Sequence, residues 1–186
     1  IWGSRHQLKV VGAFYLNRAS GALEGGQLQL GVGRPLFSLR TRFGWQAQFQ
    51  YLQDIVRYFA GGELYQRMIL GESVPDEFKR QNIAGSLQAT YSMGVVEKVN
   101  LTAGILFSRV RYALPDDFPA AISDAARRAY RDLLPRSEDT SGPYFLLDAF
   151  TARYVRLKNI QTLALSEDFR LGPEFTAEVR FASHLF

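Results

Sequence analysis

The residues that could perform acyl-transfer chemistry are Ser183 and His184, which are neighbours near the end of the sequence. A serine hydroxyl becomes a nucleophile when a histidine within hydrogen-bond reach takes its proton. Neighbouring residues of a β-strand point to opposite faces, so these two cannot form a nucleophile–base pair with each other. The sequence therefore predicts no catalytic residue and no enzyme. A membrane-embedded lipid hydrolase, with its Ser–His contact made across neighbouring strands, is kept as an alternative.

Few residues of the sequence suggest that it binds a metal ion or a phosphate. The acidic pairs Asp116-Asp117 and Glu167-Asp168 could help to bind Ca²⁺ in loops, but neither has EF-hand spacing, so both are predicted to be exposed turn carboxylates. Gly25-Gly26 and Gly61-Gly62 are predicted turn glycines, because no strand–loop–helix context makes them a phosphate cradle. Cysteine is absent, which excludes thiolate nucleophiles and cysteine-based zinc sites. No metal and no cofactor are predicted.

Composition limits the classes of protein that this chain can belong to. Its 186 residues fit one domain, 1–186, with no separate soluble domain. A hydrophobic share of 47% and a charged share of 22% exclude a disordered chain, and 13% aromatic residues favour strands. Lys and Arg are scattered along the sequence despite a net charge of +4, so no nucleic-acid partner is predicted. No window approaches the roughly 20 apolar residues of a membrane-spanning helix.

Hydrophobicity alternates with a period of two residues over most of the chain. In 43–51 the odd positions are apolar and the even positions are Gly or Gln. The pattern predicts about nine strands, at 7–16, 27–33, 43–51, 62–70, 82–93, 99–107, 144–156, 160–167 and 174–181. The longest connection, from Ala113 to Gly142, is predicted to hold a short solvated helix that Ser123 caps and that runs through Leu134 before Pro135.

Alternation alone does not separate a soluble barrel or sandwich from a membrane barrel, but three features favour the membrane barrel. The runs last about 9–13 residues, which is the length that membrane strands need. The polar positions are rich in Gln, Asn, Ser, Thr and Gly, and aromatic residues lie toward the ends of runs, where interfacial girdles belong. The predicted lumen-facing polar residues are Gln46, Gln48, Gln50, Glu174, Glu178 and Arg180. The predicted lipid-facing or girdle residues are Phe43, Trp45, Phe49, Tyr51, Tyr91, Phe107, Phe175 and Phe181.

Several stretches resemble one family. The stretch Gly33–Trp45, with the sequence GRPLFSLRTRFGW, is similar to the "Pro-Phe-Phe-Ser-Leu…Thr-x-Trp" strand–turn–strand of BamA/TamA-like outer-membrane proteins of the surface-antigen type. Gln81-Asn82 before one strand and Glu167–Gly172 after another also resemble that group. The sequence contains no POTRA-like unit and lacks the Arg-Gly-Phe/Tyr motif of that family's inward-folded loop. Both departures fit a piece of a larger barrel, as does the odd strand count.

The resemblance implies a 16-stranded barrel in the bacterial outer membrane, involved in assembly or translocation of other outer-membrane proteins. Its partners would be the lipid bilayer, unfolded client proteins and periplasmic POTRA domains. The fold class expected is therefore all-β, an antiparallel up-and-down transmembrane β-barrel that forms part of a larger one. A passive porin or solute channel, filtered by the lumen-facing residues named above, is the other alternative.

Overall fold

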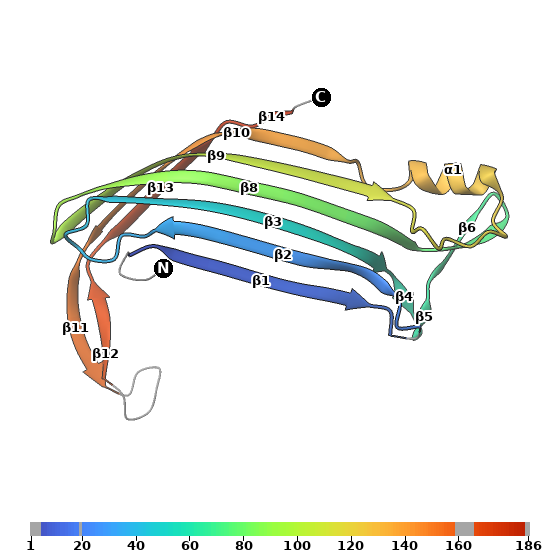
Figure 1. The fold of residues 1–186 in the computed structure, drawn as a ribbon, viewed down its shortest axis with the longest axis horizontal. Helices are drawn as coiled ribbons and strands as arrows, with labels where there is room; N and C mark the ends of the chain where they lie inside the picture. Colours follow the sequence, from blue (N-terminus) through green and yellow to red (C-terminus); the bar gives the residue numbers. More distant parts are fainter. Residues whose placement is uncertain (1–4, 19, 159–165, 185–186) are drawn as a thin grey trace.

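A long antiparallel sheet dominates the computed structural model, which describes residues 5–18, 20–158 and 166–184 (Figure 1). Seven strands follow one another across it in the order β1-β2-β3-β8-β9-β10-β13, and each pairs antiparallel with the next. Their bounds are β1 Gln7–Leu16, β2 Leu23–Arg34, β3 Phe43–Arg57, β8 Glu77–Met93, β9 Glu97–Ala113, β10 Glu138–Thr151 and β13 Glu174–Arg180. The short β14, Ser183–His184, also pairs with β10.

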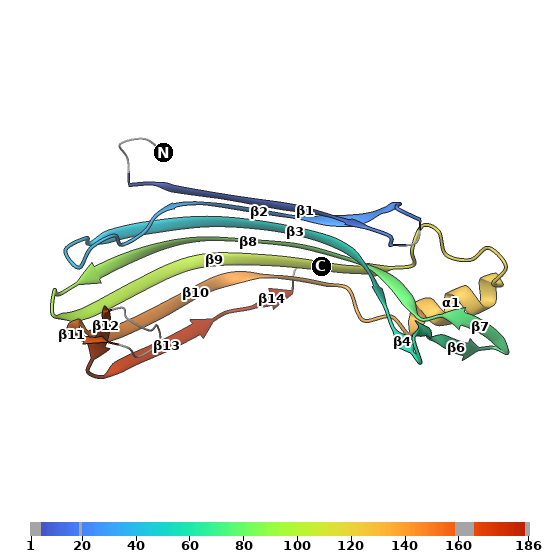
Figure 2. The same cartoon turned by 90° about the horizontal axis from the view of Figure 1, so that it is seen from below.

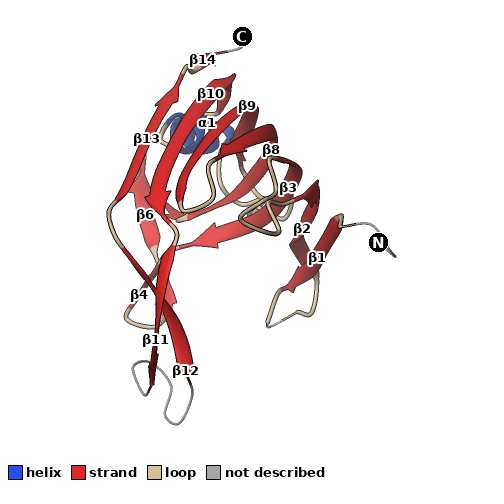
Figure 3. Cartoon of the chain, turned by 90° about the vertical axis from the view of Figure 1, so that its left-hand side faces the viewer, coloured by secondary structure: helices blue, strands red, loops and turns tan. Residues whose placement is uncertain are grey.

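The predicted mostly-β antiparallel fold is confirmed, but a closed barrel is not found among the described residues. The sheet bends as an arc, seen along the strands in Figure 3, and Figure 2 shows its strands side by side from β1 to β13. Strands β1 and β13 lie at its two edges, and in the described part of the chain they do not pair with each other. The sheet is therefore open, because no described hydrogen-bond ladder joins its edges.

Three small hairpins stand off the main sheet. Strands β11 (Arg153–Lys158) and β12 (Ser166–Leu171) pair with each other and project from one end of the sheet, here called the hairpin end (Figure 1). At the opposite end, called the helix end, lie β4 (Phe59–Ala60) with β5 (Glu63–Leu64) and β6 (Gln66–Ile69) with β7 (Glu72–Pro75). Two long connections thus lie at the helix end: the one from β3 to β8, which contains these two hairpins, and the one from β9 to β10.

Several predicted boundaries are wrong. The predicted strand 62–70 is split between β5 and β6, because Tyr65 instead pairs through its backbone with Tyr58 and Asp76. The predicted strand 144–156 ends at Thr151, and β11 begins beyond Ala152. The chain from Glu138 to Gly142, predicted as loop, already belongs to β10. Of the predicted strand 160–167, residues 160–165 lie outside the described residues.

The glycine pair at 25–26 was also assigned wrongly, since it lies inside β2 and not in a turn. At Gly25 a side chain is excluded because an added Cβ would lie 2.0 Å from the carbonyl oxygen of Gln53. Gly61 and Gly62 are turn glycines as predicted, with φ of +63° and +87°. Glu167 and Asp168 belong to β12, so their prediction as turn residues is wrong.

A compact lobe at the helix end contains α1 (Asp124–Asp132) and the β6–β7 hairpin. Ser123 caps the helix, as predicted, by accepting a hydrogen bond from the backbone N of Ala126. The buried core of the lobe consists of Ile69, Val74, Ile122, Ala126 and Tyr130. No described helix has the length and apolarity needed to cross a membrane.

Tyr130 joins the lobe to the sheet. Its hydroxyl donates a hydrogen bond of 2.9 Å to Oδ1 of Asp76 and lies 3.2 Å from the carbonyl oxygen of Glu77. Burial raises the pKa of Tyr130 above its ordinary value of 10.0, and the hydrogen bond to Asp76 raises it further. The folded lobe therefore retains a proton that an unfolded tyrosine would release at alkaline pH.

We expect the Tyr130→Phe substitution to destabilise the lobe by about 1–2 kcal/mol at neutral pH, since a buried hydrogen bond to a carboxylate is lost. The contribution of Tyr130 is fully present below pH 10 and is lost as the pH rises through its raised pKa, so the wild-type lobe should become less stable at alkaline pH. Hydrogen exchange of the β6–β7 hairpin measures both effects. Tyr154→Phe, at an exposed position, is the control. Unchanged exchange in Tyr130→Phe would contradict this role.

Candidate functional site

The two faces of the sheet differ in chemistry. Residues paired across antiparallel strands point to the same face, so the register assigns each strand residue to one face. One register row contains Val10, Leu30, Phe49, Gly85 and Phe107. The adjacent row, on the opposite face, contains Lys9, Gly31, Gln48, Ser86 and Leu106. These rows belong to what we call the apolar face and the polar face.

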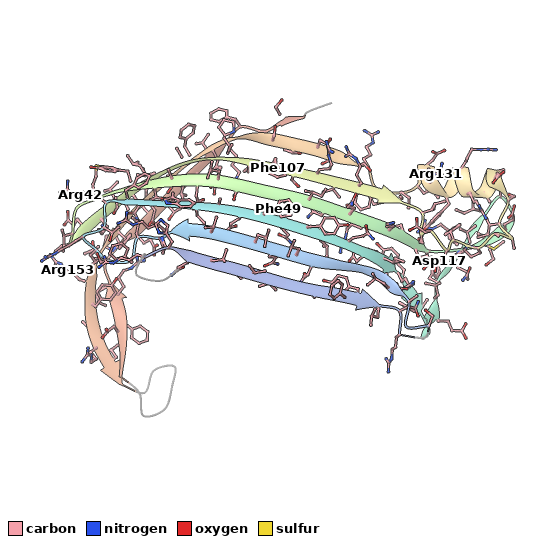
Figure 4. All side chains as sticks on the ribbon, in the orientation of Figure 1. Arg42, Phe49, Phe107, Asp117, Arg131 and Arg153 are labelled. Carbon is pink, nitrogen blue, oxygen red and sulfur yellow. The ribbon has the colours of Figure 1, made fainter. Side chains whose placement is uncertain are left out.

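Large side chains of the apolar face are not covered by other described parts of the chain. Leu87 and Ile105, paired across β8 and β9, are 51% and 58% exposed. Figure 4 shows Phe49 and Phe107 over the middle of the sheet, whereas the labelled charged residues lie at its ends. A continuous exposed apolar surface of this kind marks a site that contacts another apolar phase or partner.

The apolar surface has a sharp margin toward the helix end, beyond which the same face becomes polar. On the strands from β2 to β10, the last large apolar residues before that margin are Leu28, Tyr51, Ile83, Phe107 and Pro143; on β1 the apolar residues continue through Phe14 to Leu16, which lies past the register shift at Tyr15/Leu16. The next residues on this face include Gln53, Gln81, Arg109 and Ser141. The apolar band is the part of the apolar face on the hairpin-end side of this margin.

The margin runs obliquely across the strands. The register row through Pro143 passes through Ile105, Leu87, Ala47 and Val32 and meets β1 at Leu8. On β1, however, the last apolar residue of this face within the regular register is Phe14, six residues from Leu8, and Leu16 follows past the register shift. At about 3.3 Å per residue and about 4.8 Å per strand, six residues over the five strand steps from β1 to β10 correspond to an angle of about 40°. The strands are therefore inclined by about 40° to a line drawn perpendicular to the margin of the band.

The polar face is hollowed by a groove of about 490 Å³ that crosses several strands. Gln46, Gln48 and Gln50 of β3 line the groove, together with residues of the neighbouring strands such as Lys9 and Ser86. Elsewhere on this face polar side chains pair across strands, as in the 2.8 Å hydrogen bond between the hydroxyls of Thr90 and Thr102. The face thus offers amide and hydroxyl groups to a polar solvent or ligand.

On both faces of the sheet, an aromatic ring covers a glycine of the neighbouring strand and fills the space where the glycine has no side chain. An added Cβ at Gly85 would lie 2.4 Å from the Phe107 ring, and one at Gly104 would lie 2.6 Å from the Tyr144 ring. Each ring therefore occupies the space that a side chain would take on the neighbouring strand. Such aromatic–glycine pairs help to fix the register of neighbouring strands.

The structure places the predicted residues on opposite faces in two coherent sets. The six predicted lumen-facing residues lie on the polar face: Gln46, Gln48, Gln50, Glu174, Glu178 and Arg180. The eight predicted lipid-facing or girdle residues lie on the apolar face: Phe43, Trp45, Phe49, Tyr51, Tyr91, Phe107, Phe175 and Phe181. The register does not bring either set to a single point; it spreads each set over β3 and the strands on both sides.

The catalytic and metal candidates are dispersed. Ser183 and His184 pair through their backbones with Ser141 and Thr140 of β10. Asp116 pairs with Lys79 at 2.9 Å, and Asp168 pairs with Arg156 at 3.2 Å. Among the described residues no group of three or more His, Asp or Glu side chains could hold a metal ion.

Two charge clusters on the apolar-face side were not predicted from the sequence. Arg57 binds Glu24 and Glu77, which come from the two strands beside β3. Arg109 and Arg111 both pair with Asp139 just beyond the margin of the apolar band. The pairs are 20 to 33 residues apart in the sequence. Only the strand register brings them together, so no local motif could have identified them.

No protein family model, no curated protein and no solved structure matches this chain.

Proposed function

We propose that the main sheet, from β1 to β13, forms part of the wall of a bacterial outer-membrane β-barrel, with the apolar face against lipid and the polar face toward a hydrated lumen. The oblique apolar band carries this proposal. Strands of transmembrane barrels are tilted by about 35–45°, and the margin of the band gives about 40°.

The height of the band supports the same proposal. On β8 the apolar face is apolar from Ile83 to Met93, ten residue steps, with Gly85 covered by Phe107. Ten steps of about 3.3 Å, inclined by about 40°, give a height of about 25 Å, which matches the apolar band of outer-membrane barrels. The hollow polar face, lined by uncharged glutamines, is suited to water.

The role of the barrel in assembly or translocation of outer-membrane proteins is the finer part of the proposal. It is supported by the resemblance of Gly33–Trp45 to BamA/TamA-like proteins. This stretch has the strand–loop–strand form that the resemblance implies, since β2 ends at Arg34 and β3 begins at Phe43. The loop is held in place by Arg5 and Arg34, whose guanidinium carbons lie 3.8 and 5.7 Å from the Phe37 ring centroid. A passive porin would have the same kind of wall. Single-channel conductance of the whole barrel separates the two functions, because only the porin is expected to be a permanently open pore.

Spin labels on adjacent residues test the orientation of the wall. The chain has no cysteine, so Ile105→Cys and Leu106→Cys each create one labelling site, on the apolar and polar faces respectively. In lipid bilayers we expect the label at 105 to be accessible to oxygen and protected from a water-soluble nickel chelate. The label at 106 should show the reverse. Two labels with equal exposure to the nickel chelate would refute the lipid-facing assignment.

A further inference from the structure

A second candidate site lies on the apolar face, at the helix-end margin of the apolar band. A hollow of about 250 Å³ opens there between β9 and β10. Ile83 and Phe107 line it on the side of the band, while Arg109 and Asp139 line its charged side. Ser141, which is paired with Phe107, has a short side chain and leaves the space open. The hollow therefore has one apolar wall and one charged wall.

The charged side of the hollow carries an excess positive charge when Arg111, which adjoins the hollow through Asp139, is counted with Arg109. The Asp139 carboxylate accepts hydrogen bonds from Nε of Arg109 at 3.1 Å and from Nη2 of Arg111 at 2.7 Å. One carboxylate thus faces two guanidinium groups, which leaves a net charge of +1. The side chains of Arg109 and Arg111 are 57% and 41% exposed, so both remain accessible to a ligand. The nearby Lys79 is paired with Asp116 and does not change this balance.

Two guanidinium groups at one place are suited to a phosphate. Each guanidinium has five N–H donors in a planar fork, and Asp139 engages only some of them. A phosphate group presents several oxygens that accept such donors in pairs. A free anion would use the charged wall alone, whereas a lipid would also place an acyl chain on Phe107 and along the apolar band.

We propose that this hollow binds the phosphate of an anionic phospholipid, with Arg109 and Arg111 as the phosphate ligands. The inference rests on the proposed function, because it needs the apolar band to lie in the hydrocarbon core. The margin of the band then lies at the depth of the headgroups, and Asp139 competes with the phosphate for the same two arginines. Basic clusters at this depth attract anionic lipids.

The preference of the full chain for spin-labelled phosphatidylglycerol over spin-labelled phosphatidylcholine, measured by electron paramagnetic resonance in phosphatidylcholine bilayers, tests the proposal. We expect a preference of about fivefold for the wild type. The triple variant R109Q/R111Q/D139N, which leaves no unpaired carboxylate, should lose it. D139N alone, which keeps both arginines and removes their competitor, should strengthen it. R128Q/R131Q, which removes two exposed charges from α1, should not alter it.

A preference that falls in D139N would show that the cluster has only a structural role and would overturn the proposal. Displacement of the lipid by millimolar inorganic phosphate would identify a site for soluble anions and would overturn it as well. Failure here is separable from failure of the proposed function. If phosphatidylcholine is immobilised at the protein surface but phosphatidylglycerol is not preferred, only the headgroup site is wrong. If neither lipid is immobilised, the lipid-facing wall is wrong.

Discussion

Replacing Leu87 with arginine is expected to destabilise the bilayer-inserted protein by about 2–4 kcal/mol, because Leu87 lies within the apolar band. Its side chain is 51% exposed, so the substitution creates no steric conflict within the sheet. The cost arises from placing a charge in hydrocarbon. It is measured by urea titration of folding into lipid vesicles.

Ser86→Arg provides the matched control, because Ser86 is the neighbouring residue of β8 and lines the groove on the polar face. The same arginine at position 86 would face water and should cost less than about 0.5 kcal/mol. Equal costs at positions 86 and 87 in the bilayer would contradict the assignment of the two faces.

Replacing Arg57 with methionine should destabilise the folded chain by about 3 kcal/mol. The Arg57 side chain is 22% exposed, and those of Glu24 and Glu77 are 13% and 11% exposed. Its guanidinium binds Glu24 through two hydrogen bonds of 2.9 and 2.5 Å and Glu77 through one of 2.8 Å. Removing it leaves two largely buried carboxylates facing each other without a counter-charge, and breaking a buried ion pair in this way typically costs about 3–5 kcal/mol.

Two controls separate the charge effect from lost packing. Adding Glu24→Gln and Glu77→Gln to the Arg57→Met chain removes the unpaired charges and should recover most of the loss. Arg156→Met disrupts an exposed pair, in which Arg156 and Asp168 are 73% and 60% exposed, and should cost less than about 1 kcal/mol. Urea midpoints of the variants give the comparison. A loss in Arg57→Met that the two glutamines do not reduce would show that packing, and not charge, is responsible.

The sequence predicted strands well only where they carry the apolar band. The prediction for 43–51 begins at the observed start of β3 but ends six residues early. Beyond Tyr51 the alternation is lost, because Leu52 turns to the polar face and Gln53 to the apolar face. Gln53 pairs with Gln81 beyond the margin, where both faces are polar or mixed. The start of β8 was missed for the same reason, since alternation reports an apolar environment and not a hydrogen-bonded ladder.

Turn residues misled the prediction at the start of β10. Gly142 and Pro143 are strong turn formers, yet they lie within β10 and pair with Leu106 and Ile105. At Gly142 the segment that follows β13 comes so close that an added Cβ would lie 1.6 Å from the carbonyl oxygen of Phe181. A glycine is needed at position 142 because only a residue without a side chain allows the two segments to approach this closely. Such long-range contacts, like those of Arg57 and Asp139, leave no trace in the local sequence.

The slant of the apolar band also restricts how such a sheet could enter a bilayer. With its strands parallel to the bilayer normal, the band margins on β1 and β10 would differ in depth by about 20 Å, two thirds of a hydrocarbon core about 30 Å thick. One edge of the sheet would then carry polar residues into the core while the other edge left apolar residues in water. If the proposed placement is right, the sheet fits a bilayer only with its strands inclined by about 40° to the normal, and an upright paired sheet would have to rotate in its plane to reach that orientation. The pairing register of the strands, which fixes the slant of the band, would thus also fix the tilt of the inserted sheet.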